Sequence, residues 1–196
     1  MGTGSAWAQA RPTEDVGPSE GPPATAPDND SATKTIPIPR GQDATREHAD
    51  ALRDAYLARS RGLGGALAGW AAASMVLGAT QWATADDAFT RGIGIQNLAW
   101  GGIDGILATI GLASSIGEDG VAAPAADWEG KRQTLETIYW VNFGLDVAYV
   151  TTGALLWGLG GNDDVRGAGA GVVLQGSFLF AYDFVGAMTM RLTPYE

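Results

Sequence analysis

The chain has 196 residues, a net charge of −10, and 45% hydrophobic but only 17% charged residues. It has no cysteine and one histidine, His48, which excludes disulfides, thiolate metal sites, histidine-rich zinc sites and haem ligation. The acidic balance argues against nucleic-acid binding, which needs clustered lysine and arginine. We therefore expect no cofactor, no metal and no nucleic-acid partner.

The first 42 residues differ in composition from the rest of the chain. Seven of the nine prolines lie there, among Gly, Ser, Thr, Asp and Glu. Such a segment cannot bury enough apolar surface to offset the entropy of ordering, so we predict a disordered tail over 1–42. The stretch 6–10 resembles the small-residue site that ends a signal peptide, but no charged region and no apolar stretch precedes it.

An amphipathic helix is predicted over 43–61. Ala49, Leu52, Ala55 and Tyr56 recur at helical spacing beside several arginines. This pattern is typical of a segment that lies at the membrane interface and leads into the first span.

Four apolar stretches fill the remaining domain, 62–196. They cover 62–82, 92–116, 137–160 and 167–190. At 1.5 Å per residue each can cross the ~30 Å hydrocarbon core of a bilayer as a helix. The fold class we predict is therefore all-α, a four-helix transmembrane bundle with the lipid bilayer as its surroundings.

Orientation follows from the basic residues that flank these spans. One face carries Arg91 and Arg166, whereas the other carries Arg46, Arg53, Arg59, Arg61, Lys131, Arg132 and Arg191. The positive-inside rule then predicts a multi-pass protein of the bacterial inner membrane with both termini in the cytoplasm. A cleaved signal peptide would export the amino end, but the signal is incomplete and we prefer the charge distribution.

An internal repeat of one helical hairpin is also predicted. The stretches 86–94 and 163–169 both read Asp-Asp, a short spacer, then Arg-Gly-x-Gly, and Gln96 precedes Asp104 by the same spacing as Gln175 precedes Asp183. Copies two spans apart enter the membrane in the same direction, which implies an axis along the membrane normal. Chance similarity in a chain rich in Gly and Asp is the alternative.

Polar residues at mid-span mark the candidate site. A carboxylate at membrane depth costs at least ~2.5 kcal/mol on insertion scales, so each must have a compensating role. Helical spacing places several amides, phenols and carboxylates on inward faces. The predicted polar intramembrane cluster comprises Asn97, Asp104, Asn142, Asp146, Tyr149, Gln175, Tyr182 and Asp183.

Two interpretations of this cluster stay open. Polar side chains often hold membrane helices together beside Gly-x-x-x-Gly motifs, which occur here at 65–69, 101–105 and 167–171, and a protonated aspartic acid could take part. Such glycine faces also favour self-association or assembly into a larger membrane complex. The functional interpretation is a site whose oxygen donors suit protons or hard cations.

The function classes follow from these interpretations. Nucleophilic catalysis lacks a base, because no serine of the spans has a histidine partner in the sequence. The leading hypothesis is a non-enzymatic accessory or scaffold subunit. The alternative is a small proton or cation translocator that uses the aspartates, and a lipid-acting membrane enzyme ranks third.

Two motifs carry a resemblance to known sequences. The stretches 142–149 (NFGLDVAY) and 175–183 (QGSFLFAYD), together with Asn97 and Trp100-Gly101, resemble a family of small bacterial four-helix membrane proteins of unknown function. The similarity extends over about 45 to 190. It implies the same four-helix topology and no particular activity, so it provides no catalytic, cofactor or metal residue.

Overall fold

The computed structural model describes residues 40–192, which form four helices: α1 (Arg40–Thr84), α2 (Ala88–Gly117), α3 (Ala125–Leu159) and α4 (Asp163–Arg191). The described residues contain no strand. The predicted all-α, four-helix fold is thus confirmed. The predicted tail and its signal-like stretch lie outside the described residues, apart from 40–42, which belong to the first turn of α1.

The first helix is longer than a membrane is thick. α1 has 45 residues, or about 68 Å at 1.5 Å per residue, against a hydrocarbon core of about 30 Å. The predicted interfacial segment and the first span are therefore one continuous helix. Its charged first half, 43–61, continues the axis of the span instead of forming a separate helix.

Short loops with side-chain caps join α1 to α2 and α3 to α4. The Asp87 carboxylate accepts a hydrogen bond from the backbone N–H of Thr90 (2.7 Å) and starts α2. The Asn162 side chain accepts from Val165 N–H (2.9 Å) and starts α4 in the same way. Each cap satisfies a backbone donor that the first helical turn leaves free.

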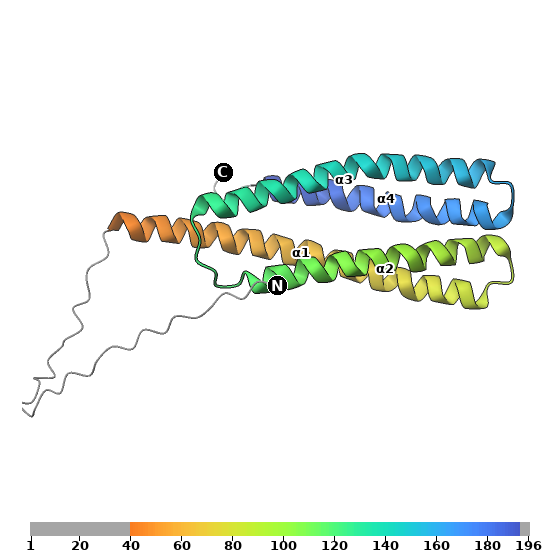
Figure 1. Cartoon of the computed structure of the whole chain (residues 1–196), viewed down its shortest axis with the longest axis horizontal. Helices are drawn as coiled ribbons and strands as arrows, with labels where there is room; N and C mark the ends of the chain where they lie inside the picture. Colours follow the sequence, from red (N-terminus) through yellow and green to blue (C-terminus); the bar gives the residue numbers. More distant parts are fainter. Residues whose placement is uncertain (1–39, 193–196) are drawn as a thin grey trace, which may run out of the picture. The chain divides into compact units, whose positions relative to one another are not determined.

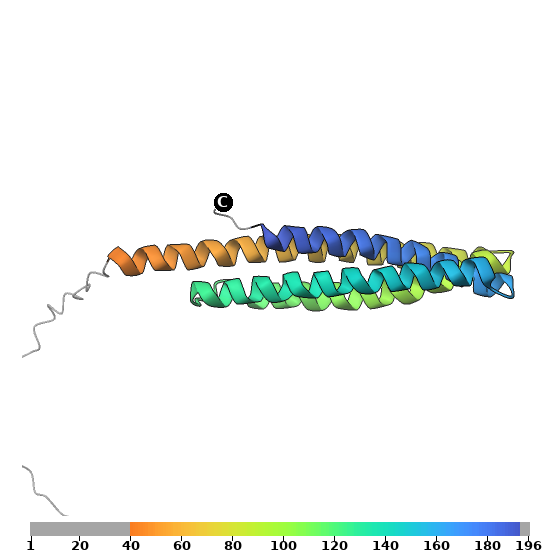
Figure 2. The same cartoon turned by 90° about the horizontal axis from the view of Figure 1, so that it is seen from above.

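The four helices form two antiparallel hairpins, α1–α2 and α3–α4 (Figure 1). The α1–α2 and α3–α4 loops lie at one end of the bundle, which we call the hairpin-loop end. The start of α1, the end of α4 and the α2–α3 connection lie toward the other, which we call the base (Figure 1). Seen from above, α2 and α3 run along one side and α1 and α4 along the other (Figure 2).

Glycines pack the helices tightly in the half nearest the hairpin-loop end. Gly78 and Gly94 bring α1 and α2 into backbone contact, and Gly153 and Gly169 do the same for α3 and α4. A Cβ on Gly94 would lie 2.7 Å from the backbone nitrogen of Trp82. Any larger residue at these crossings would force the helices apart, so the glycines keep this half of the bundle closed.

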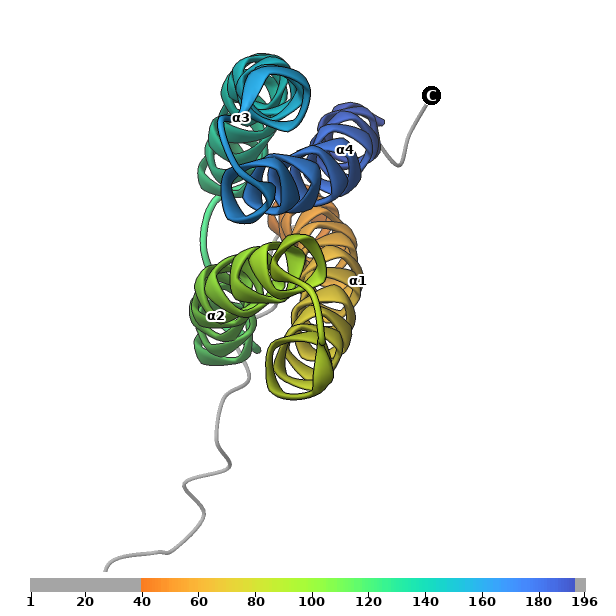
Figure 3. The ribbon, with the colours of Figure 1, turned by 90° about the vertical axis from the view of Figure 1, so that its right-hand side faces the viewer.

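A further glycine contact joins the two hairpins. A Cβ on Gly92 of α2 would lie 2.6 Å from the carbonyl oxygen of Asp164, and Gly167 of α4 packs on the backbone of Phe89. The view onto the hairpin-loop end shows α2 and α4 adjacent there (Figure 3). At the base the hairpins meet instead through Leu63 of α1 and a cluster on α3 and α4 formed by Tyr139, Ala187 and Met190.

The three Gly-x-x-x-Gly motifs have different surroundings. Gly101 packs on the backbone of Ala71 in α1, and the motif at 167–171 packs on α2. A Cβ added to Gly65 or Gly69 would meet no described atom within 4 Å. Self-association through that first motif stays a prediction.

Three helices are long and apolar enough to cross a membrane: α1, α2 and α4. In the most apolar 18-residue stretch of each helix, only 28%, 22% and 39% is buried, so most of these apolar side chains point outward. Exposed residues such as Val76 (70%) and Ile106 (63%) would contact lipid. Both observations favour a membrane protein.

Helix α3 is not among these three, although the sequence predicts a span over 137–160 within it. The predicted span ends at the C-cap of α3, Gly160. The sequence explains the difference. Its first turns carry charges such as Lys131 and Arg132, and its span contains Asn142 and Asp146. In a bundle these polar groups can face the protein interior, which reduces the hydropathy of the helix without exposing them to lipid.

Candidate binding site between α2 and α3

The structure divides the predicted polar cluster into two groups, and the first is a network of amides. The Gln175 amide nitrogen donates to the Asn97 side-chain oxygen (2.7 Å) and to the Ser74 hydroxyl (3.2 Å). Trp70 donates its indole N–H to the Gln175 oxygen (2.8 Å), and Asn97 donates to the Gln81 oxygen (2.8 Å). We call these five residues the Gln175 network.

The Gln175 network joins α1, α2 and α4 and satisfies the side chains that form it. Asn97 and Gln175 are 0% and 1% exposed, and both have hydrogen-bond partners. The sequence prediction missed the α1 members, Trp70, Ser74 and Gln81. Their spacing, four and then seven residues, places them on one helical face and was the available signal.

The second group is the carboxyl cluster: Asp104 of α2, Asp146 of α3 and Asp183 of α4. The side chains come from three helices and are all buried, at 2%, 2% and 4% exposure. All three line the same cavity. The three aspartates of the sequence prediction therefore share one site.

Two oxygens of the carboxyl cluster have no hydrogen-bond partner. Oδ2 of Asp104 and Oδ2 of Asp146 are buried and unpaired. A buried polar atom left without a partner costs about 1–3 kcal/mol. The carboxyl cluster thus differs from the Gln175 network, in which Asn97 and Gln175 both have hydrogen-bond partners.

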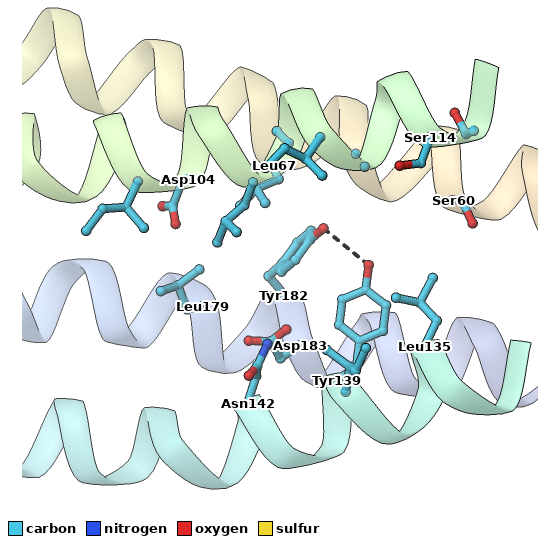
Figure 4. A pocket seen from close by; sticks show the side chains of 18 of the residues that line it. Ser60, Leu67, Asp104, Ser114, Leu135, Tyr139, Asn142, Leu179, Tyr182 and Asp183 are labelled. Atoms are coloured by element: carbon cyan, nitrogen blue, oxygen red, sulfur yellow. Dashed lines mark hydrogen bonds between the residues drawn. The ribbon is translucent and has the colours of Figure 1, made fainter. Parts of the chain in front are cut away.

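Phenols and an amide flank the carboxyl cluster. Asn142 and Asp183 lie on the opposite side of the cavity from Asp104 (Figure 4). Tyr182 donates to the Leu63 carbonyl of α1 (3.2 Å), and its hydroxyl lies 3.4 Å from that of Tyr139. Tyr139 was not predicted, although it continues the spacing of Asn142 and Asp146 along α3.

The carboxyl cluster lines a cavity of about 580 Å³, which we call the α2–α3 groove. No Cα of α2 lies within 8 Å of a Cα of α3 in the described chain, so the two helices stand apart. Apolar side chains form most of the walls. Those at the rim are exposed to the surroundings, among them Ile103, Leu107, Ile110, Ile138 and Leu145.

An aromatic pair marks one end of the groove. Trp100 of α2 and Tyr149 of α3 meet edge to face across it, with ring centroids 5.3 Å apart. Beyond this pair, toward the hairpin-loop end, the glycine contacts close the bundle. Tyr149, one of the predicted site residues, therefore belongs to the groove through its ring and is 41% exposed.

Charged residues surround the other end of the groove, at the base. Arg61 donates to the Ser115 carbonyl (2.9 Å) and pairs with Asp119 (3.4 Å), while Lys131 pairs with Glu118 (2.5 Å). These pairs hold the α2–α3 connection against α1 and α3. The polar end and the apolar walls together give the groove an amphipathic character.

A second charged set stabilises α3 outside its predicted span. Arg132 donates to Glu129 and Glu136 on its own helix and to the Met190 carbonyl of α4. The hydrogen bond from Arg132 holds the pKa of Glu129 below its usual range. This contact ties the end of α4 to α3.

The donor set limits what the groove can hold. Among the described residues, no three His, Cys, Asp or Glu side chains converge closely enough to hold a metal ion. No described lysine, arginine or histidine lines the groove, whereas four carboxylic residues do, Glu118 and the three aspartates. The described arrangement offers carboxyl groups and other hydrogen-bonding groups within apolar walls.

Comparison with known families identifies the chain's relatives. The model of a family of unknown function, DUF6992, matches residues 66–184. The chain belongs to this family. The matched segment contains all eight predicted site residues. The Gln175 network and the carboxyl cluster therefore both lie within the family region of the chain. No curated protein and no solved structure matches the chain.

Proposed function

We propose that this DUF6992 protein is a non-enzymatic, multi-pass membrane protein that binds a small amphipathic molecule in the α2–α3 groove. The single observation that carries the proposal is that two residues lining this groove, Asp104 and Asp146, each have a buried oxygen without a hydrogen-bond partner. A molecule that donates hydrogen bonds would satisfy both. Its apolar part would lie against the walls.

The size of the groove supports a small molecule over a partner helix. Ligand pockets typically measure about 300–1,000 Å³, and 580 Å³ falls inside that range. A membrane-spanning helix about 30 Å long and about 10 Å across occupies on the order of 2,000 Å³. A scaffold or accessory role through this groove would need more room.

The predicted localisation belongs to the same proposal. We place the protein in the bacterial inner membrane with the base on the cytoplasmic side, because most of its lysines and arginines lie there. The exposed rim of the groove would then open toward lipid. A membrane-soluble molecule could enter sideways between α2 and α3.

The experiment uses a long-chain alcohol that carries a photoreactive diazirine, with the protein in lipid nanodiscs. We expect saturable labelling of groove residues such as Leu107 and Leu145, displaced by excess unlabelled alcohol. Gly111→Leu should reduce that labelling at least tenfold, because Gly111 lines the groove and a Cβ there meets no described atom within 4 Å.

Gly102→Leu is the matched control. Gly102 lies on the opposite face of the same helix from Gly111. It has equally open space for a Cβ and does not line the groove. It should leave labelling unchanged. Labelling that does not saturate, or that is the same in wild type, Gly111→Leu and Gly102→Leu, would reflect general partitioning into lipid. Either result would overturn the proposal.

Proton or cation translocation is the second candidate. Three carboxyl groups from three helices in one cavity favour it, since intramembrane acids often form proton relays. The glycine contacts that close the hairpin-loop half weigh against a continuous path. Proteoliposomes should show a proton or sodium flux that Asp146→Asn abolishes; a silent wild-type protein would count against translocation.

A further inference from the structure

We infer that the molecule bound in the α2–α3 groove is a lipophilic cation, such as an amine or other positively charged amphiphile. This inference rests on the proposed function, because it names the chemical class of ligand for the same groove. The observation is the sign of the groove's lining. Four carboxyl side chains line the groove, and no described lysine, arginine or histidine does. Lys131 pairs with Glu118, so the three aspartates are the acids without a basic partner among the described residues.

Charge complementarity argues for this class over neutral and anionic amphiphiles. The carboxyl cluster places three acids in the lining of one groove, and two of their oxygens have no partner. An anion would add repulsion to that site. A cation would attract the carboxyl groups in surroundings of low dielectric constant, where Coulomb interactions are strong.

The nearest positive side chains do not neutralise the cluster. Arg61 is bound to the Ser115 carbonyl and Asp119, and Lys131 is bound to Glu118 and lies 4.6 Å from the centre of the Trp128 ring. Both are at the base, outside the lining of the groove. The cluster therefore lacks an internal counter-ion among the described residues.

Aromatic rings give the groove a second feature that suits a cation. Trp100, Tyr139, Tyr149 and Tyr182 line it together with the carboxyl cluster. The face of an aromatic ring attracts a cation by about 0.5–2 kcal/mol, depending on how far the pair is desolvated. Trp100 and Tyr149 are adjacent across the groove, so one ligand could contact both rings.

The experiment compares two ions of nearly the same shape and opposite charge. Each ion, tetraphenylphosphonium or tetraphenylborate, is mixed with the nanodisc protein and the diazirine alcohol before irradiation, so that it competes with the alcohol for the groove and lowers the labelling. Binding is corrected with empty nanodiscs, because the interfacial dipole potential makes the two ions partition differently. We expect tetraphenylphosphonium to displace the alcohol and tetraphenylborate to displace it at least tenfold less well.

Variants test whether the carboxyl cluster causes the preference. Asp104→Asn and Asp146→Asn keep the side-chain shape and remove the charge, so each should weaken displacement by tetraphenylphosphonium about tenfold, measured relative to the alcohol labelling of the same variant and to displacement by tetraphenylborate. Asp119→Asn is the control, because that acid pairs with Arg61 outside the groove. It should leave displacement by tetraphenylphosphonium unchanged.

The outcomes separate this inference from the proposed function. Equal displacement by both ions, or stronger displacement by tetraphenylborate, would overturn the cation preference and leave the groove as a binding site. Displacement that survives both aspartate variants would also overturn it. If the alcohol itself gives no saturable labelling, the proposed function fails, and the cation inference fails with it.

Discussion

Gln175 occupies the centre of the buried amide network, with Asn97, Ser74 and Trp70 around it. Each interhelical hydrogen bond in a membrane contributes about 0.6–2 kcal/mol. Because one side chain joins three helices, its loss would leave several partners unsatisfied at once. This residue should therefore matter for stability and not for ligand binding.

Gln175→Leu should lower the free energy of unfolding by on the order of 2 kcal/mol, since three hydrogen bonds disappear. Gln81→Leu is the matched control, because it removes one bond of the same network, and it should cost about a third as much. Titration with a denaturing detergent, followed by tryptophan fluorescence, measures both. Equal losses for the two variants would contradict a central role for Gln175.

At the base, Arg132 joins α3 to the end of α4 through its hydrogen bonds. Arg132→Gln should destabilise the protein by about 1–3 kcal/mol, because it loses charged hydrogen bonds to Glu129 and Glu136 and the bond to the Met190 carbonyl. Thermal unfolding in detergent at pH 7 checks the loss.

The pH dependence of that loss has a defined sign. The pKa of Glu129 is lowered in the folded protein by its hydrogen bond from Arg132. Its contribution is complete above the unfolded pKa of about 4.3 and disappears as the pH falls through the folded pKa. The difference between wild type and Arg132→Gln should therefore shrink below about pH 4; a constant difference would show that Glu129 is not the partner that matters.

At the scale of the elements, the glycine crossings decide which parts of the bundle are closed. Gly78 with Gly94 and Gly153 with Gly169 occupy corresponding places in the two hairpins. Their geometry supports the predicted hairpin repeat in this half of the bundle. The aspartates do not follow it, because Asp183 lies about one helical turn farther from Gly167 than Asp104 lies from Gly92.

Gly153→Ala should open the α3–α4 crossing. The new Cβ would lie 2.8 Å from the backbone nitrogen of Val173 and 2.9 Å from the Gly169 oxygen, so the helices must separate. We expect a loss of 1 kcal/mol or more, about the cost of overpacking. Gly144→Ala on the same helix has open space, so it should be neutral or stabilising through helix propensity. Thermal unfolding of both variants provides the comparison.

At the scale of the whole molecule, the bundle has one closed half and one half with a lateral groove. The hairpins meet through α2 and α4 near the hairpin-loop end and through α1 with α3 and α4 at the base. Because no Cα of α2 lies within 8 Å of a Cα of α3 in the described chain, a groove remains between the two helices and its apolar rim is exposed. The binding proposal depends on this arrangement more than on any single residue.

The orientation of the bundle can be measured directly because the chain has no cysteine. Ala122→Cys lies in the α2–α3 connection, whereas Asp86→Cys and Gly161→Cys lie in the two hairpin loops. With the base in the cytoplasm, a membrane-impermeant maleimide added to intact cells should label the loop cysteines and spare Ala122→Cys. The opposite pattern would reverse the predicted topology.

The sequence alone determined the four helices, the apolar character of their surfaces and the three buried aspartates. Helical period, span length and the cost of a charge in lipid are local properties, and each can be read from a short stretch. The same reasoning selected Asn97 and Gln175 but missed Trp70, Ser74, Gln81 and Tyr139. Those four residue types are ordinary in membrane helices, so only their helical spacing could have indicated them.

Only the tertiary structure decided how the polar residues divide. Whether a buried side chain is satisfied depends on partners from other helices, and helix rotation and crossing set those partners. The packing pairs Gln175 with Asn97 and leaves oxygens of Asp104 and Asp146 unpaired beside a groove. Composition cannot distinguish these cases, because an amide or a carboxyl group within a span can be either satisfied or unpaired; the difference lies in which helices touch.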